Sequence, residues 1–265
     1  MTRYPSPMRL SSIFLIISLL VFNSGCAWLG KQADPTAHMS AEELYSTAKE
    51  SLEKNDYEIA IQHFESLEAR FPFGRYAQQA QLEIAYAYYK SGESDSAIAA
   101  LDRFINRHPQ HPHADYAWYM KGLVNFNRGA SFLDRLFPRD ATERDNRVAL
   151  QAFQDFTELL QRYPNSRYAE DASLRVVFLH NGLARYEINV AEYYIRRGAP
   201  VAAVNRARFV LENYQRTPAV ADALVVQVKG YRMLGMDSLA EDALRVLRTN
   251  YPEHAFLTDR RAAAQ

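Results

Sequence analysis

A short phrase that recurs along the chain constrains its fold more than any other feature. The phrase ends in proline at Arg70-Phe71-Pro72, Arg107-His108-Pro109, Arg162-Tyr163-Pro164 and Asn250-Tyr251-Pro252, and a degenerate copy stands at Asn213-Tyr214-Gln215. The steps between third positions are 37, 55, 51 and 37 residues, so the two long steps equal 37 plus insertions of 18 and 14 residues. Self-similarity at this period is typical of a solenoid, in which each unit packs on its neighbours.

The residues before each phrase repeat as well. An alanine stands twelve residues before each third position, at Ala60, Ala97, Ala152, Ala203 and Ala240. The residue eight before is Phe64, Leu101, Phe156, Ala207 or Leu244. The residue five before is Leu67, Phe104, Leu159, Val210 or Leu247, so these two positions are mostly larger and apolar. A turn residue stands seventeen before in four units: Asn55, Gly92, Gly198 and Gly235. The proline cannot extend a helix and therefore marks the end of each unit.

This pattern resembles the tetratricopeptide repeat, a helix-turn-helix unit in which small residues let two helices approach. The first helix shows it as Trp118 with Gly122, as Ala85 with Tyr88, and as Tyr231. Only 10 Gly and 11 Pro occur in 265 residues, so helix propensity is high throughout. We therefore predict an all-α solenoid of five such repeats from about residue 40 to 255, the alternative being unrelated amphipathic helices.

Two insertions interrupt the period. The first, residues 130–147, is predicted between the helices of unit three, and its apolar residues Phe132, Leu133, Leu136 and Phe137 favour packing on the solenoid or docking a partner. The second, residues 183–196 in unit four, contains no proline, so we predict a first helix lengthened by about four turns.

The first 25 residues have the composition of an export signal. Arg3 and Arg9 precede an apolar stretch over residues 10–22, which is too short to span a bilayer, and the small residues Ser24 and Gly25 follow. The sole cysteine, Cys26, comes next, in a context that resembles a bacterial lipobox, although Asn23 departs from the usual Leu. The resemblance implies acylation of Cys26, the alternative being an ordinary free or buried cysteine. Several acyl chains would give a stable membrane anchor.

The expected organisation follows from these features. Residues 1–25 form the lipoprotein signal peptide and residues 26–39 a flexible tether. Residues 40–168 form the N-terminal repeats and residues 169–265 the C-terminal repeats. Ala27, in place of Asp, favours sorting to the outer membrane by resemblance to other lipoproteins.

No motif in the chain predicts catalysis or a cofactor. G-x-S-x-G, P-loop, G-x-G-x-x-G and H-E-x-x-H motifs are all missing from the sequence. His108, His111 and His113 stand beside two prolines without a neighbouring cysteine, so a solvated turn between units is favoured over a zinc site. Lys plus Arg equal Asp plus Glu at 31 each, so the composition gives no basis for nucleic-acid binding.

Aromatic residues gather on the first helices of the N-terminal units. In the tetratricopeptide family, regularly spaced positions of the first helix line a concave groove, which implies this candidate set: Tyr45, Lys49, Leu82, Tyr86, Tyr89, Lys90, Tyr116, Tyr119, Leu123 and Phe126. Tyrosines offer a large contact area and hydroxyls that bond to an extended backbone. Lys49 and Lys90 are candidates for binding a carboxylate. The alternative is that individual rings pack between helices.

The C-terminal units differ in composition. From residue 201 onward there are nine Lys or Arg and seven Asp or Glu, with few aromatic residues. Arg206 and Arg208 lie on the predicted second helix of unit four, and arginine is suited to pairing with carboxylates at interfaces. They are candidates for docking a protein partner, and solvated arginines are the alternative.

Across nearly its whole length the chain resembles the BamD family (ComL/YfiO) of lipoproteins. The residues that carry the resemblance are Arg70-Phe71-Pro72-Phe73-Gly74, Tyr86-Ala87-Tyr88-Tyr89-Lys90, Asp102-Arg103-Phe104-Ile105, Tyr163-Pro164-Asn165-Ser166, Val190-Ala191-Glu192-Tyr193-Tyr194 and Val204-Asn205-Arg206. The resemblance implies a non-catalytic adaptor of the β-barrel assembly machinery, lipid-anchored to the outer membrane and facing the periplasm. Its expected partners are unfolded barrel proteins in the N-terminal half, and BamA with other Bam lipoproteins in the C-terminal half.

Two other functions are alternatives for such a chain. One is a scaffold lipoprotein of another envelope complex, such as cell-wall or pilus assembly, which co-purifying partners would distinguish. The other is an enzyme, for which the sequence offers no nucleophile or metal constellation to test.

Overall fold

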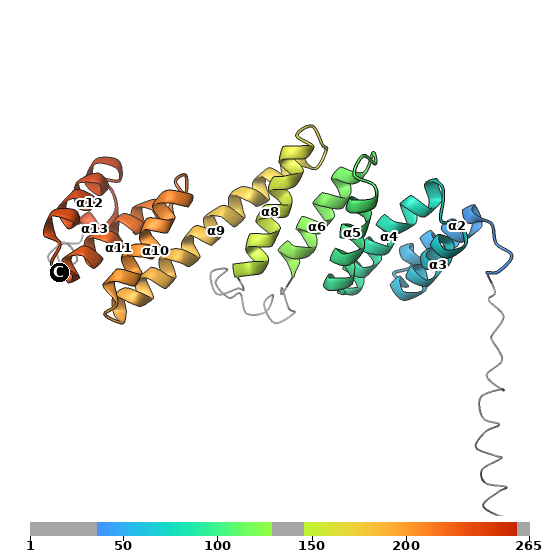
Figure 1. The fold of residues 1–265 in the computed structure, drawn as a ribbon, viewed down its shortest axis with the longest axis horizontal. Helices are drawn as coiled ribbons and strands as arrows, with labels where there is room; N and C mark the ends of the chain where they lie inside the picture. Colours follow the sequence, from blue (N-terminus) through green and yellow to red (C-terminus); the bar gives the residue numbers. More distant parts are fainter. Residues whose placement is uncertain (1–35, 129–145, 259–265) are drawn as a thin grey trace, which may run out of the picture.

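The chain is an elongated stack of helices in the computed structural model, which describes residues 36–128 and 146–258 (Figure 1). Within these two ranges every regular element is a helix and no strand occurs. None of the described helices is both long and apolar enough to cross a bilayer. The prediction of an all-α fold is confirmed.

The helices pair as five antiparallel hairpins in chain order, one for each predicted unit. The first helices of the pairs are α2 (Ala41–Glu53), α4 (Arg75–Ser91), α6 (Ala114–Asn127), α9 (Ala169–Arg196) and α11 (Ala219–Met233). The second helices are α3 (Tyr57–Arg70), α5 (Ser94–Arg107), α8 (Asn146–Arg162), α10 (Pro200–Asn213) and α12 (Asp237–Asn250), after which a single turn, α13 (Ala255–Thr258), follows. Each helix packs mainly on the helices before and after it, as in a solenoid.

The repeated apolar positions form the interior. All fifteen alanines and larger apolar residues that stand twelve, eight and five residues before each phrase end are at most 3% exposed. Phe64, Phe104 and Phe156 are among the largest fully buried side chains. The small alanine lets the two helices of a hairpin approach, and the larger residues fill the space beside it. The buried residues form five core clusters along the stack.

In four of the five hairpins the turn contains a left-handed residue. Asn55, Gly92, Gly198 and Gly235 have φ angles of 65°, 87°, 70° and 70°. These are the four turn residues that the sequence repeat singles out. In this region a side chain clashes with the backbone, so glycine or asparagine is favoured.

Replacing Gly92 by Ala is expected to lower the free energy of unfolding by about 1–2 kcal/mol, because alanine is strained at positive φ. No atom lies within 4 Å of the added Cβ, so backbone strain alone should cause this loss. Gly182→Ala is the matched control, since Gly182 lies inside α9 with the same open surroundings. There alanine should raise stability by about 0.5–1 kcal/mol. Urea denaturation followed by circular dichroism measures both, and equal effects would contradict this account.

The insertion predicted in unit four is a lengthened helix. α9 has 28 residues, whereas the other full helices described have 13 to 17. Its first half packs on α8 and its second half on α10 and α11, so it links the two halves of the stack (Figure 1). The insertion predicted in unit three lies outside the described residues, apart from Asn146 and Arg147, which begin α8.

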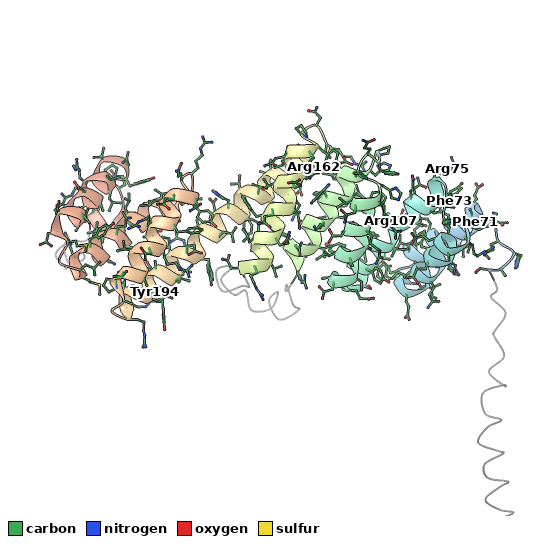
Figure 2. The ribbon with its side chains drawn as sticks, viewed as in Figure 1. Phe71, Phe73, Arg75, Arg107, Arg162 and Tyr194 are labelled. Atoms are coloured by element: carbon green, nitrogen blue, oxygen red, sulfur yellow. The ribbon has the colours of Figure 1, made fainter. Side chains whose placement is uncertain are left out.

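The expected tether ends earlier than residue 39. The Arg70 guanidinium donates hydrogen bonds to the carbonyls of Thr36, Ala37 and Met39 at 2.5, 2.9 and 2.8 Å. Ser40 then caps α2 in a capping box with Glu43. Residues 36–39 are therefore held against the end of α3, and the rest of the predicted tether, with Cys26, lies outside the described residues. Figure 2 shows Phe71 and Phe73 of the following loop at this same end of the stack.

Candidate functional site

The first helices of successive hairpins form one continuous face of the stack. α2 contacts α4, α4 contacts α6, and α9 contacts α11. The candidate aromatic residues of the N-terminal half lie on these helices. We call the surface over α2, α4, α6 and the first half of α9 the first-helix face.

Between α2 and α4, the carboxylate of Glu83 joins the two helices by hydrogen bonds. Tyr45 Oη and Lys49 Nζ, both on α2, donate to the same oxygen of Glu83 on α4, Oε1, at 3.3 and 3.0 Å. The Tyr45 ring also contacts Phe64 and Tyr76, with centroid distances of 5.7 and 5.3 Å. Burial, and then the charge of Glu83, raise the pKa of Tyr45 to about 12, so its hydroxyl stays protonated.

Between α4 and α6, further tyrosines are half-buried. Tyr86 packs against the core clusters on both sides of α4, and Tyr89 Oη accepts a hydrogen bond from Asn127 Nδ2 at 2.9 Å. Tyr116 of α6 lies against the same core, and burial, followed by the charge of Glu83, raises its pKa. The charge of Glu83 therefore raises the pKa of a tyrosine at each of the two seams, Tyr45 at α2–α4 and Tyr116 at α4–α6.

Between α6 and α9, the aromatic residues form a stacked cluster. The rings of Tyr119 and Tyr168 are parallel within 15° at a centroid distance of 4.5 Å, and Tyr116 lies 5.7 Å from Tyr168. Tyr119 Oη donates to Asp171 Oδ2 at 2.8 Å. Burial, and then this bond, raise the pKa of Tyr119 to about 12. Asp171 also accepts from Arg175 at 2.6 Å, and this bond lowers the pKa of the Asp171 carboxyl.

The cluster ends in exposed apolar residues of α9. Phe126 of α6 lies 5.9 Å from Phe178, and the Arg175 guanidinium lies 4.8 Å from the centroid of Phe126. Leu174, Val177 and Phe178 of α9 are all more than half exposed. Sequence reasoning missed Tyr168, Leu174 and Phe178, because the insertion in unit four displaces their positions relative to the repeat. The exposed apolar spacing of residues 174, 177 and 178 on one helical face was the available signal.

Not every candidate lies where it was expected. Leu82 is 7% exposed and packs inside the core between α4, α5 and α6, so its assignment to the groove is corrected. Its position faces the second helix of its own unit. Lys49 is engaged by Glu83. Lys90 is exposed and makes no ion pair with another described residue.

Comparison with known proteins decides the family. The family model described as YfiO, outer membrane lipoprotein, matches residues 37–247. A Neisseria meningitidis serogroup A protein named outer membrane protein assembly factor BamD is 46% identical over 252 residues, which cover 94% of each chain. The chain belongs to the BamD family.

Other members of the BamD family agree over most of their length. Proteins of this name from Xylella fastidiosa and Vibrio cholerae are 42% and 37% identical, over 95% and 89% of this chain and 85% and 95% of theirs. Among solved structures, PilW, a type IV pilus biogenesis factor, is similar with a TM-score of 0.37 and 17% identity, over 84% of this chain and 98% of that one. A likeness at this score supports no statement about function.

In this BamD-family chain, the arginines predicted to dock a partner differ in their surroundings. Arg206 of α10 donates to Glu187 of α9 at 2.8 Å, and Glu187 is buried. This bond raises the pKa of Arg206 and ties α10 to α9. Arg208 is exposed. Partner docking by either residue stays a prediction.

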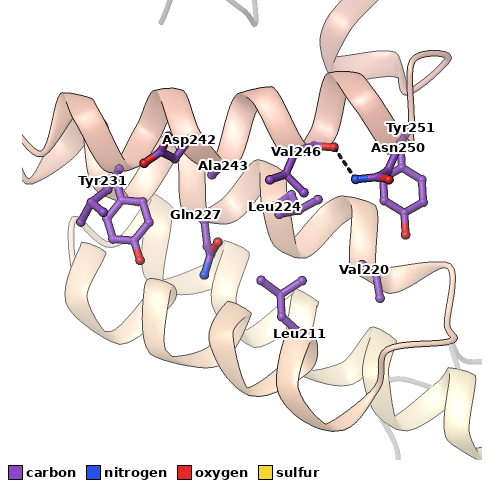
Figure 3. A pocket seen from close by; sticks show the side chains of 11 residues that line it. Leu211, Val220, Leu224, Gln227, Tyr231, Asp242, Ala243, Val246, Asn250 and Tyr251 are labelled. Carbon is purple, nitrogen blue, oxygen red and sulfur yellow. Dashed lines mark hydrogen bonds between the residues drawn. The ribbon is translucent and has the colours of Figure 1, made fainter.

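A cavity opens among the last helices of this BamD-family chain. It has a volume of about 660 Å³ and lies between α10, α11 and α12 (Figure 3). Its wall is mainly apolar, with Leu211, Leu224 and Val246, and the rings of Tyr231 and Tyr251 stand at its two ends (Figure 3).

The histidines of the turn between α5 and α6 pack beside a core ring. The His111 ring lies 5.1 Å from Phe104 and 5.6 Å from His113, and burial lowers the pKa of His111. Within residues 36–128 and 146–258, no group of three or more His, Cys, Asp or Glu side chains is arranged to hold a metal ion.

Proposed function

We propose that this chain is a non-catalytic adaptor of the β-barrel assembly machinery. In this proposal the first-helix face of the N-terminal repeats receives unfolded outer-membrane barrel proteins, and the C-terminal repeats hold BamA and other Bam lipoproteins. One observation carries the proposal. A continuous run of half-buried aromatic residues, with hydroxyls and exposed apolar residues beside them, covers four helices of a chain whose family is named for outer-membrane protein assembly.

The chemistry of this face suits a barrel strand. Such strands alternate apolar and polar residues. The rings of Tyr86, Tyr119 and Phe126 offer apolar contact area, and the tyrosine hydroxyls offer hydrogen bonds to an extended backbone. Tyrosines lose little conformational entropy when they are already packed, so the face is prepared to bind.

Of the two candidate lysines, the charges on this face favour Lys90 for binding a terminal carboxylate. Lys49 already donates to Glu83, whereas Lys90, at the end of α4, is exposed. A carboxylate that approaches Lys90 meets a cation without an ion-pair partner among the described residues, and one that approaches Lys49 meets a neutralised pair. Lys90 is therefore the candidate for binding the C-terminal end of a barrel protein.

The proposal also includes a lipid anchor on Cys26, which would hold the chain at the membrane. The chain belongs to a family of outer membrane lipoproteins. Acylation of Cys26 would hold the repeats at the periplasmic side of that membrane. Nine residues lie between Cys26 and Thr36, so their Cα atoms are at most about 35 Å apart when this stretch is extended. Thr36, just before α2, would then stay within this distance of the bilayer.

Replacing Tyr86 and Tyr119 together by Ala is expected to weaken binding of a synthetic barrel C-terminal peptide by roughly tenfold or more, because aromatic anchors dominate such interfaces. Association with BamA should be retained, since both residues lie in the N-terminal half. Fluorescence anisotropy measures the peptide affinity, and co-elution in detergent measures the association.

The control is Tyr57→Ala. Tyr57 is also half-buried, but it lies on the second helix α3, away from the first-helix face. Circular dichroism establishes that each variant is folded. Unchanged peptide affinity in the folded double variant, or an equal loss in Tyr57→Ala, would reject the assignment of the groove.

A further inference from the structure

Among the residues that the structure describes, Glu83 is the one carboxylate that accepts hydrogen bonds from two groove candidates. Tyr45 Oη and Lys49 Nζ both donate to its Oε1 atom, at 3.3 and 3.0 Å. Neither donor reaches Oε2, which makes no hydrogen bond to another described residue and is not among the buried atoms left without a partner. The Glu83 side chain is 23% exposed, so this second oxygen is accessible from the first-helix face.

Because of this geometry, the surface between α2 and α4 offers an open acceptor but no unmatched cation. The ammonium of Lys49 is matched by one carboxylate, and the hydroxyl proton of Tyr45 points to the same oxygen. An incoming carboxylate would have to displace Glu83 from Lys49 while facing the negative charge of Glu83. An incoming N–H donor or cation finds Oε2 open, and a hydrogen bond to a charged acceptor is stronger than one to a neutral acceptor.

We infer that Glu83 determines which part of a barrel segment lies over α2 and α4. It excludes the C-terminal carboxylate from this seam, and it accepts a backbone N–H or a basic side chain from an internal stretch of the strand. The terminal carboxylate then lies beyond the seam, on the side of Lys90. This inference rests on the proposed function and specifies the position that a barrel segment takes along the same groove.

The neighbouring tyrosines support this role. Tyr116, on the other side of α4, is near enough for the charge of Glu83 to raise its pKa. Among the described residues, Glu83 has one hydroxyl partner, Tyr45, and one ion-pair partner, Lys49. Removing the Glu83 charge while keeping its shape should free Lys49 for an external carboxylate.

The experiment compares two synthetic peptides of about ten residues with alternating apolar and polar side chains and a terminal phenylalanine. One ends in a free carboxylate and the other in an amide. The wild-type full chain should favour the free acid only through the exposed Lys90, and by less than the roughly tenfold effect of one charged hydrogen bond. Glu83→Gln should shift the ratio by about tenfold toward the free acid, because Lys49 becomes available. Adding Lys49→Met to Glu83→Gln should abolish that shift.

Glu65→Gln is the matched control, because Glu65 accepts a hydrogen bond from Tyr88 at 3.4 Å but lies on α3. It should leave the ratio unchanged. Three results would overturn the inference: a strong preference for the free acid in the wild type that Lys49→Met removes, an unchanged ratio in folded Glu83→Gln, or an equal shift in Glu65→Gln. Binding of neither peptide would instead refute the proposed function, and this inference with it.

Discussion

Replacing Phe156 by Ala is expected to lower the free energy of unfolding by about 3–5 kcal/mol, the largest effect of any single core truncation we predict. Phe156 is fully buried in the core of unit three. Its ring lies 6.1 Å from Tyr119 and 6.4 Å from Phe126, which both belong to the first-helix face. A cavity at this position would therefore loosen the groove as well as the core.

The close fit around this ring explains the size of the effect. A Cβ added at Gly122 would lie only 2.6 Å from Phe156, so the ring fills the space that the glycine of α6 leaves open. Urea denaturation followed by circular dichroism measures the loss. Phe73→Ala is the control, because Phe73 is 93% exposed and should change stability by less than about 0.5 kcal/mol. A loss below about 1 kcal/mol in Phe156→Ala would show that the repeat does not pack as described.

Replacing Lys121 by Met is expected to cost about 3–5 kcal/mol at neutral pH, because it leaves a buried carboxylate without its cation. Asp155 of α8 is 2% exposed, and Lys121 Nζ lies 3.5 Å from it and 2.8 Å from Asp102 of α5. Asn125 and Gln151 donate to Asp155 at 2.7 and 3.2 Å, so the polar group is satisfied but its charge depends on Lys121. The network joins α5, α6 and α8.

The loss caused by Lys121→Met should depend on pH. Burial raises the pKa of Asp155 above its ordinary 3.8, and this effect outweighs the charge of Lys121 and the hydrogen bonds. A carboxyl whose folded pKa is raised stabilises the fold when protonated, and this contribution is lost as pH rises from 3.8 through the raised value. Without Lys121 the folded pKa rises further, so the variant should approach the wild type as the pH falls.

Denaturation of both proteins over a range of pH tests this expectation. The double variant Lys121→Met, Asp155→Asn removes the unpaired charge and should recover more than half of the lost stability. A deficit that stays constant with pH, or a double variant no more stable than Lys121→Met, would show that Lys121 acts through packing alone.

The fold was predictable because its signal is repeated. A single alanine or glycine says little, but five alanines at one position, and four turn residues seventeen before the phrase end, indicate the same hairpin five times. The residues Asn55, Gly92, Gly198 and Gly235 all have the positive φ that such a turn requires. The lengthened α9 was predictable for a related reason, since fourteen extra residues without proline can continue a helix.

The candidate groove was less predictable, because side-chain partners come from helices far apart in the sequence. The sequence places Lys49 and Tyr45 on one helix face, but it does not show that Glu83, on the next first helix, meets both. Leu82 was assigned to the groove by counting residues, and a rotation of about 100° per residue separates a core position from a groove position. Counting back from the phrase end of unit four did not identify Tyr168 and Phe178, because the insertion that lengthens α9 displaces these positions relative to the repeat.

The two halves of the molecule meet along α9, which gives an adaptor two surfaces on one rigid element. Its first half carries Arg175 and Phe178 beside the groove, and its second half carries Glu187, which pairs with Arg206. A continuous helix fixes the distance between a bound substrate segment and a partner on the C-terminal repeats.

The most direct test of the account is to isolate the full chain from its own membranes in mild detergent and identify its partners and its modifications by mass spectrometry. We expect an acyl-modified Cys26, stoichiometric BamA and other Bam lipoproteins. The tyrosine double variant Tyr86→Ala, Tyr119→Ala should retain these partners while losing unfolded barrel proteins. Recovery with cell-wall or pilus components and without BamA would contradict the account.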